Sequence, residues 1–417
     1  MNHSWVFASL LAAAVGYATL ASGHVPAGLA AGRANLLPPQ AVLVDLLSSN
    51  VLGSNGTFRD SSTATFFNPT NTTPPFFQVL DPSFLTVLGP KAFVRAVTSN
   101  PDFAFAHEAP IWDPQTDEVF FASNDGGALG RSDIDHNNLV GKISLLEVAQ
   151  AFQASKSDVS PVNVTVTELS LPEAIQMTNG GTGTFHGNLI LINSGRGSRP
   201  PSIALVNPRS PNNATVLLDN FFGRQFNSLN DIKVHPKSGK LFFTDVTYGW
   251  LNHFRPLPLM PNQVYRFDPV TGSVRMVADG FDRPNGIAFT ADGKTAYVTD
   301  TGESGGFLGN NQTEPASIYQ FDVEPKTQMF TNRRVFAYVD NGVPDGIQVD
   351  MEGNVFSGCG DGVQVWNNEG TLIGKVFLGT TSANLVFASK GRLVIMAETS
   401  IYFAQTATEG QDLASLG

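Results

Sequence analysis

Short apolar runs alternate with polar turns along most of the chain, and one arrangement of the two recurs. Between Phe226 and Asp245, a polar turn with Asn230 and Asp231 precedes a strand-like run, a Lys-Ser-Gly turn and a second strand-like run. Short alternating runs bounded by turn residues predict β-hairpins. This hairpin is the template for the other repeats.

The template returns three times downstream. Asn285 takes the place of Asn230 in FDRPNGIAFTADGKTAYVTD, and Asp345 takes it in VPDGIQVDMEGNVFSG. TSANLVFASKGRLVIMAE is a looser match that places Asn384 there. An oxygen-bearing side chain therefore opens each of these hairpins.

Two upstream segments have the same outline, and they open with Glu108 and His186. The chain then has six units of roughly forty to seventy residues with about four short strands each, which is typical of a β-propeller. We predict an all-β fold, a six-bladed β-propeller over residues 101–417, with an N-terminal irregular arm. Residues 24–100 are rich in Pro, Asn, Thr and Ser, and we expect them to wrap around the propeller with little regular structure.

Composition agrees with a folded β protein and narrows its partners. Of the 417 residues, 42% are hydrophobic and 15% are charged, and 40 Gly and 26 Pro are scattered along the chain. The net charge of −11 argues against nucleic acid and against an anionic membrane surface as partners. It is compatible with a cation site.

The N-terminus predicts secretion. The single cysteine, Cys359, taken alone favours the cytosol. However, the apolar run from Trp5 to Leu20 and the small residues after it are typical of a cleaved signal peptide over residues 1–23. No other segment has the apolar length to span a bilayer. Five glycosylation sequons fit a secreted protein: Asn55, Asn71, Asn163, Asn213 and Asn311.

The opening side chains predict a metal site. In a propeller the innermost strands start at one end of the central channel, so Glu108, Asn230, Asn285 and Asp345 are expected to converge on the axis. Two carboxylates and two amides suit a hard cation such as Ca²⁺, with Mn²⁺, Mg²⁺ or Zn²⁺ as alternatives. Taken singly, Asn and Asp beside Gly are ordinary turn formers. Asp231 should face the other side of its strand as a structural or second-layer residue.

Two residues are candidates for the general base. His186 stands at the first position of the one unit that does not begin with an oxygen-bearing side chain. The ordinary pKa of histidine, near 6.5, suits proton transfer. Asp345 is the alternative, since it can act as base while it contacts the metal. His107, next to Glu108, is expected to face away from the site.

The motifs SLNDIKVHPKSGKLFFTDVTYGW, RPNGIAFTADGKTAYVTDT and VPDGIQVDMEGNVFSGCGDGVQVW resemble the SMP-30/gluconolactonase/LRE-like family, including its fungal secreted lactonohydrolases. The resemblance covers about residue 103 to the C-terminus. It implies a six-bladed propeller that hydrolyses lactones with Ca²⁺ or another divalent ion on its axis. By motif, the family's metal ligands fall on Glu108, Asn285 and Asp345, and the Asn of its N-D motif falls on Asn230. The sequence around His186 is similar to the catalytic His-Gly of paraoxonase-type lactonases.

The leading hypothesis is therefore a metal-dependent lactone hydrolase of gluconolactonase or lactonohydrolase type, acting on a small-molecule aldonolactone or pantolactone-like substrate. The first alternative is a non-catalytic, secreted, calcium-binding propeller, in which the ion only joins the blades. A second alternative is a strictosidine-synthase-like condensing enzyme. The set of oxygen ligands argues against this one, because such an enzyme needs no metal.

Overall fold

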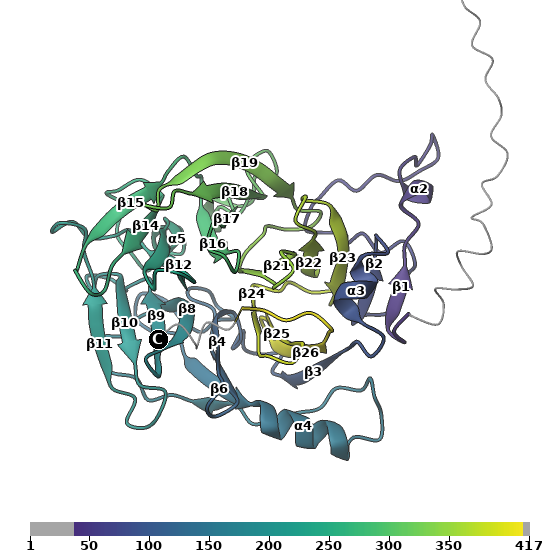
Figure 1. Ribbon diagram of the computed structural model, residues 1–417, viewed down its shortest axis with the longest axis horizontal. Coiled ribbons are helices and arrows are strands. Elements are labelled where there is room, and N and C mark those ends of the chain that lie inside the picture. Colours follow the sequence, from purple (N-terminus) through teal and green to yellow (C-terminus); the bar gives the residue numbers. More distant parts are fainter. Residues whose placement is uncertain (1–36, 412–417) are drawn as a thin grey trace, which may run out of the picture. The chain divides into compact units, whose positions relative to one another are not determined.

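The structure is a computed structural model that describes residues 37–411. The chain divides into Met1–Leu37 and Pro38–Gly417, and the second unit holds six β-sheets around a common axis (Figure 1). The predicted all-β, six-bladed β-propeller is confirmed. The predicted signal peptide, residues 1–23, lies outside the described residues.

Four blades follow one another along the chain, each with its first strand innermost. From the axis outward they comprise β4 (Glu108–Asp113), β5 (Glu118–Ala122), β6 (Val140–Ser144) and β7 (Thr167–Glu168); β8 (Thr178–Phe185), β9 (Asn188–Asn193), β10 (Ser202–Val206) and β11 (Ala214–Leu218); β12 (Leu229–Val234), β13 (Leu241–Asp245), β14 (Gln263–Phe267) and β15 (Val274–Ala278); and β16 (Pro284–Phe289), β17 (Thr295–Asp300), β18 (Ser317–Val323) and β19 (Phe330–Tyr338).

The other two blades include strands from the N-terminal extension. The fifth comprises β20 (Ile347–Val349), β21 (Val355–Cys359), β22 (Gly362–Trp366) and β23 (Leu372–Phe377), extended by β2 (Phe76–Val79) and β1 (Ala41–Leu43); the last comprises β24 (Asn384–Phe387), β25 (Arg392–Ala397), β26 (Ser400–Gln405) and β3 (Phe93–Ser99). Because β3 pairs antiparallel with β26, an N-terminal strand completes the C-terminal blade and closes the ring. Strand β3 therefore belongs to the propeller although it lies before residue 101, and three strands of the extension pair with two of the blades.

Strands β12 and β13 form the hairpin from which the repeat was first recognised, and both strands are buried along their whole length. All five residues of β13 are buried, as expected for a strand sandwiched between two blades. The turn before it contains Gly239, whose φ of +65° is a conformation that favours glycine, and whose N–H donates to the His235 carbonyl. Between this blade and the preceding one, Phe243 stacks on Tyr265 and contributes to a cluster that includes Ile190 and Ile192.

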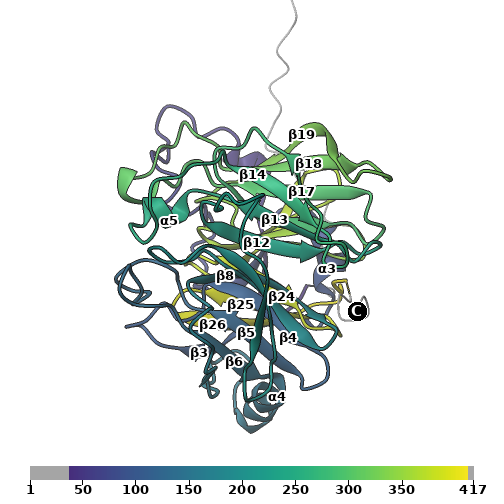
Figure 2. The ribbon, with the colours of Figure 1, turned by 90° about the vertical axis from the view of Figure 1, so that its left-hand side faces the viewer.

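The described helices are short segments in the connections between strands: α2 (Leu46–Ser49), α3 (Phe84–Leu88), α4 (Leu145–Ala154), α5 (Tyr248–Leu251) and the 3₁₀ turn η2 (Gly306–Leu308). Helix α4 lies at the outer edge of the ring in both views (Figures 1 and 2). Among residues 37–411, the structure has no helix with the length and apolar character needed to cross a membrane.

A shared irregularity marks the start of four innermost strands. In β4, β8, β12 and β16 the pairing register shifts just after the first residue, which is a β-bulge. Bulges redirect side chains at sheet edges and next to active sites. Here the bulges occur at the same end of the channel, where the polar opening residues lie.

Candidate active site

The starts of the innermost strands surround a cavity of about 240 Å³ at one end of the channel. Glu108 comes from β4, Asn230 from β12 and Asn285 from β16, while Asp345 lies just before β20. The structure therefore brings together all four residues that were expected to converge. Their positions agree with the geometric argument, since equivalent slots of different blades face one axis.

The carboxylates of this cavity are crowded. Ligand atoms of His107, Glu108 and Asp345 all lie within 4.8 Å of one another. Burial raises the pKa of Glu108 well above its usual value, and the nearby charge of Asp345 adds to the rise. Burial likewise raises the pKa of Asp345 to about 7. Two carboxylates in a poorly solvated place favour a compensating cation.

Three oxygens of the cavity test whether a cation fits. Asn179 Oδ1, Asn230 Oδ1 and Asp345 Oδ1 are buried and have no hydrogen-bond partner among the described residues. Unpaired buried acceptors are costly, and their clustering at one cavity needs a reason. A hard divalent cation prefers a mixed set of carboxylate and amide oxygens, so these residues fit such an ion.

Asn179 was not predicted, although it occupies the slot that was assigned to His186. Strand β8 begins at Thr178, and Asn179 follows at the bulge, as Asn230 does in β12. Asn179 lines the cavity; its Nδ2 donates to Asp125 Oδ2 at 2.9 Å, and its Oδ1 has no partner among residues 37–411. The Asn-Gly pair at 179–180, like that at 285–286, was the signal available in the sequence.

The prediction that His186 opens an innermost strand was wrong. His186 follows β8 in the turn to β9, has a φ of +48° and is exposed. It is absent from the lining of the cavity. The reason is that β8 (Thr178–Phe185) extends upstream through a glycine-rich stretch, so that Asn179 and not His186 occupies the position equivalent to Asn230.

His107 lines the cavity instead of facing away from it. Its Nδ1 lies 2.7 Å from Glu398 Oε1, and its Nε2 lies 3.8 Å from Glu108 Oε1. Burial opposes the charged imidazolium, but Glu398 and the other carboxylates outweigh burial and raise the pKa of His107 well above its usual value. A histidine oriented by a carboxylate therefore borders the cavity.

The side chains of Asp231 and Asn384 accept hydrogen bonds from backbone N–H groups of their own strands. Asp231 Oδ1 accepts from the N–H of Ile232 at 2.8 Å, and Asn384 Oδ1 accepts from the next N–H of its own strand at 2.9 Å. Asn384 Nδ2 also donates to Glu108 Oε2 at 2.7 Å, which fixes that carboxylate. Asp231 is buried, and burial raises its pKa.

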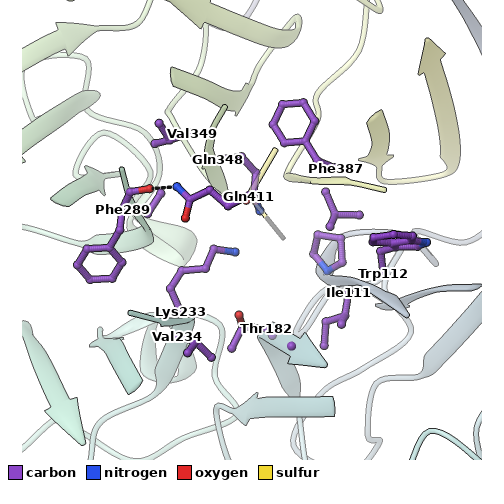
Figure 3. A pocket seen from close by; sticks show the side chains of 15 residues that line it. Ile111, Trp112, Thr182, Lys233, Val234, Phe289, Gln348, Val349, Phe387 and Gln411 are labelled. Carbon is purple, nitrogen blue, oxygen red and sulfur yellow. Dashed lines mark hydrogen bonds between the residues drawn. The ribbon is translucent and has the colours of Figure 1, made fainter. Parts of the chain in front are cut away.

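A second cavity, of about 50 Å³, lies where the innermost strands end (Figure 3). Apolar side chains such as Ile111 and Phe387 line it, Lys233 points into it, and Gln411 donates to the Phe289 carbonyl across it. None of the predicted metal or catalytic residues borders it. The candidate active site is therefore the cavity at the strand starts.

Comparison with known proteins identifies the family. The SMP-30/Gluconolactonase/LRE-like region matches residues 107–399. The chain belongs to this family. The match begins at His107 and ends after Glu398, so it includes every residue described at the active-site cavity.

Relatives in the SMP-30/gluconolactonase/LRE-like family include Lactonohydrolase oryL of Aspergillus oryzae, 29% identical over 324 residues that cover 73% of this chain and 68% of the relative. A Gluconolactonase of Zymomonas mobilis is 30% identical over 206 residues, 47% of this chain and 55% of that protein.

Solved structures show the same fold. A gluconolactonase from Xanthomonas campestris superposes with a TM-score of 0.58 at 24% identity, over 79% of this chain and 94% of that one. A calcium-binding regucalcin from Agrobacterium tumefaciens superposes with a TM-score of 0.55 at 16% identity, over 77% and 96%. At these identities the likeness is one of fold.

All five predicted glycosylation sequons lie at exposed asparagines: Asn55, Asn71, Asn163, Asn213 and Asn311. Exposure is what glycosylation requires, and secretion stays a prediction.

Proposed function

We propose that this protein is a metal-dependent lactone hydrolase, which opens a small lactone to its hydroxy acid. Relatives named lactonohydrolase and gluconolactonase support lactonase activity. The observation that supports the metal dependence is the set of buried oxygens of Asn179, Asn230 and Asp345 around one acidic cavity, which have no hydrogen-bond partner within the described part of the chain.

Glu108, Asn179, Asn230, Asn285 and Asp345 are the proposed holders of the metal, which we infer to be Ca²⁺ because all five offer oxygen. When bound, a divalent cation supplies Lewis-acid polarisation of the lactone carbonyl and stabilises the negative charge that develops on its oxygen. Other divalent ions such as Mn²⁺, Mg²⁺ or Zn²⁺ are tested by the same experiment.

The chain's own residues move the protons. In hydrolysis the water oxygen bonds to the carbonyl carbon, the ring C–O bond breaks, and the ring oxygen gains a proton. Asp345 lines the cavity, and its carboxylate accepts the proton of the attacking water. His107, held at Nδ1 by Glu398, uses Nε2 to donate a proton to the departing ring oxygen.

A lactone panel assayed with and without a chelator tests this proposal. We expect turnover of at least one lactone to vanish on metal removal and to return when Ca²⁺ or another divalent ion is added. Full turnover by metal-free protein would overturn the metal dependence. Binding of one Ca²⁺ ion without turnover of any lactone would favour the non-catalytic, secreted calcium-binding propeller instead.

A further inference from the structure

A further chamber, separate from the apolar cavity at the strand ends, adjoins the active-site cavity, and the N-terminal arm forms part of its wall. It has a volume of about 180 Å³ and shares Ser304, Val343 and Asp345 with the active-site cavity. Thr63 and Phe66, which precede β2, form part of its wall. The arm therefore contributes directly to a chamber that Asp345 also borders.

Specific contacts hold the arm in this place. Ser62 Oγ donates to Glu303 Oε1, and the Ser62 carbonyl accepts from the N–H of Gly342 at 3.0 Å. Arg59 forms an ion pair with Asp340 at 2.6 Å. These contacts join the arm to the loop after β17 and to the loop before β20, which carries Asp345.

Two residues that line the chamber have side-chain acceptors that receive no hydrogen bond from residues 37–411. Glu303 Oε2 and Asn341 Oδ1 line the chamber, are buried, and have no partner among the described residues. Glu303 is 1% exposed and Asn341 is 0% exposed, so neither is an ordinary surface side chain. Two unpaired acceptors at one chamber call for a ligand that donates, and two hydroxyl groups, each with one O–H donor, are the uncharged donors that suit them.

From these observations we propose that the chamber binds a hydroxyl-bearing substituent of the substrate, with Glu303 and Asn341 as its acceptors and residues 59–66 of the arm as its outer wall. This inference rests on the proposed lactonase function. It assigns substrate selection to the arm and to two loops, whereas bond cleavage takes place at the propeller axis. A substituent bearing a carboxylate would be repelled by Glu303 and excluded.

The test compares two substrates that differ in the substituent alone: γ-butyrolactone, and a five-membered lactone with a polyhydroxylated side chain. In the wild type we expect the hydroxylated lactone to have the higher kcat/KM. Glu303→Gln removes the charge and one acceptor, so kcat/KM for the hydroxylated lactone should fall about tenfold, while that for γ-butyrolactone changes less than about twofold. Glu369→Gln, at an exposed carboxylate in the turn between β22 and β23, is the matched control and should change neither value.

A second variant does not depend on a buried residue. Thr63 is exposed on the arm and lines the chamber, so Thr63→Phe fills the chamber without disturbing the core. It should reduce turnover of the hydroxylated lactone selectively. Equal loss on both lactones, or no loss with either variant, would overturn the inference.

Calorimetry separates a failure of this inference from a failure of the proposed function. A polyhydroxylated acid should bind the wild type more tightly than 4-hydroxybutyrate, and Glu303→Gln should abolish that preference, whether or not turnover occurs. If the wild type hydrolyses no lactone but shows this preference, the proposed function fails and the chamber assignment stands. If the wild type hydrolyses lactones without any such preference, the chamber assignment fails alone.

Discussion

The carboxylates of Glu108 and Asp345 lie close together at the axis. In the absence of metal, the wild-type protein should therefore be less stable than a variant in which one of the two charges is removed. Asp345→Asn keeps the size of the side chain and removes its charge. In the folded protein burial raises the pKa of Asp345 from 3.8 to about 7, so at pH 8 the fold contains a carboxylate where the neutral acid is favoured. Functional sites commonly reduce stability in this way.

The size of the effect follows from the shift in pKa. One pKa unit corresponds to about 1.36 kcal/mol, so a shift from 3.8 to about 7 sets an upper limit of about 4 kcal/mol. Asp345 is partly exposed to the cavity and solvent screens part of this, so we expect a gain of ~1–3 kcal/mol for Asp345→Asn at pH 8 in chelator. Because the folded-state pKa is raised, the wild type loses stability as pH rises from about 4 through about 7. The advantage of the variant should therefore grow over the same interval.

Urea unfolding measures this difference, in chelator and again in Ca²⁺. At a hundredfold excess over Kd, the ion should stabilise the wild type by about 2.7 kcal/mol, and the variant by much less. Asp102→Asn, at an exposed carboxylate in the loop before β4, is the control and should match the wild type in both conditions. An Asp345→Asn variant less stable than the wild type in chelator at pH 8 would refute the electrostatic reasoning.

Three further outcomes are expected. His107→Gln should lower kcat by ~10²-fold with little change in Ca²⁺ affinity, whereas His186→Ala, in an exposed turn, should change kcat less than about twofold; steady-state kinetics with calcium titrations decide between them. Asp125→Asn removes the anionic acceptor of the Asn179 amide and should weaken Ca²⁺ binding about tenfold in calorimetry, with an unchanged fold by circular dichroism. Burial opposes ionisation of Asp117, but its two bonds to Arg392, at 2.8 and 2.9 Å, lower its pKa. The stability this pair contributes is present above the unfolded-state pKa and is lost as pH falls through the lower folded-state value. Because solvent screens this partly exposed pair, Asp117→Asn should cost ~0.5–1 kcal/mol at pH 7 and less at pH 2.

The repeat pattern in the sequence predicted most of the fold and four of the five proposed metal-holding residues. Asn230, Asn285 and Asp345 were recognisable because each stands just before a hairpin with alternating apolar positions, and Glu108 because it stands before a similar outline. A shared slot in a closed ring of blades implies convergence on the axis, so local pattern and topology together were sufficient for these residues. The same reasoning failed for the second blade. Strand β8 has the sequence TNGGTGTF, and its glycines and threonines show too little apolar alternation to reveal a strand.

Contacts between distant parts of the chain decided the rest, because side-chain orientation depends on partners that sequence spacing does not reveal. Asn179 is oriented by Asp125, 54 residues away, and His107 by Glu398, 291 residues away. The arm lies beside Asp345 only because β1 and β2 extend the fifth blade and β3 closes the last one. The sequence by itself determined the repeating hairpin and the oxygen ligands that open it. The tertiary structure decided which histidine borders the cavity, how the ring closes and which part of the arm lines the chamber beside Asp345, since each of these depends on contacts between segments that no local pattern connects.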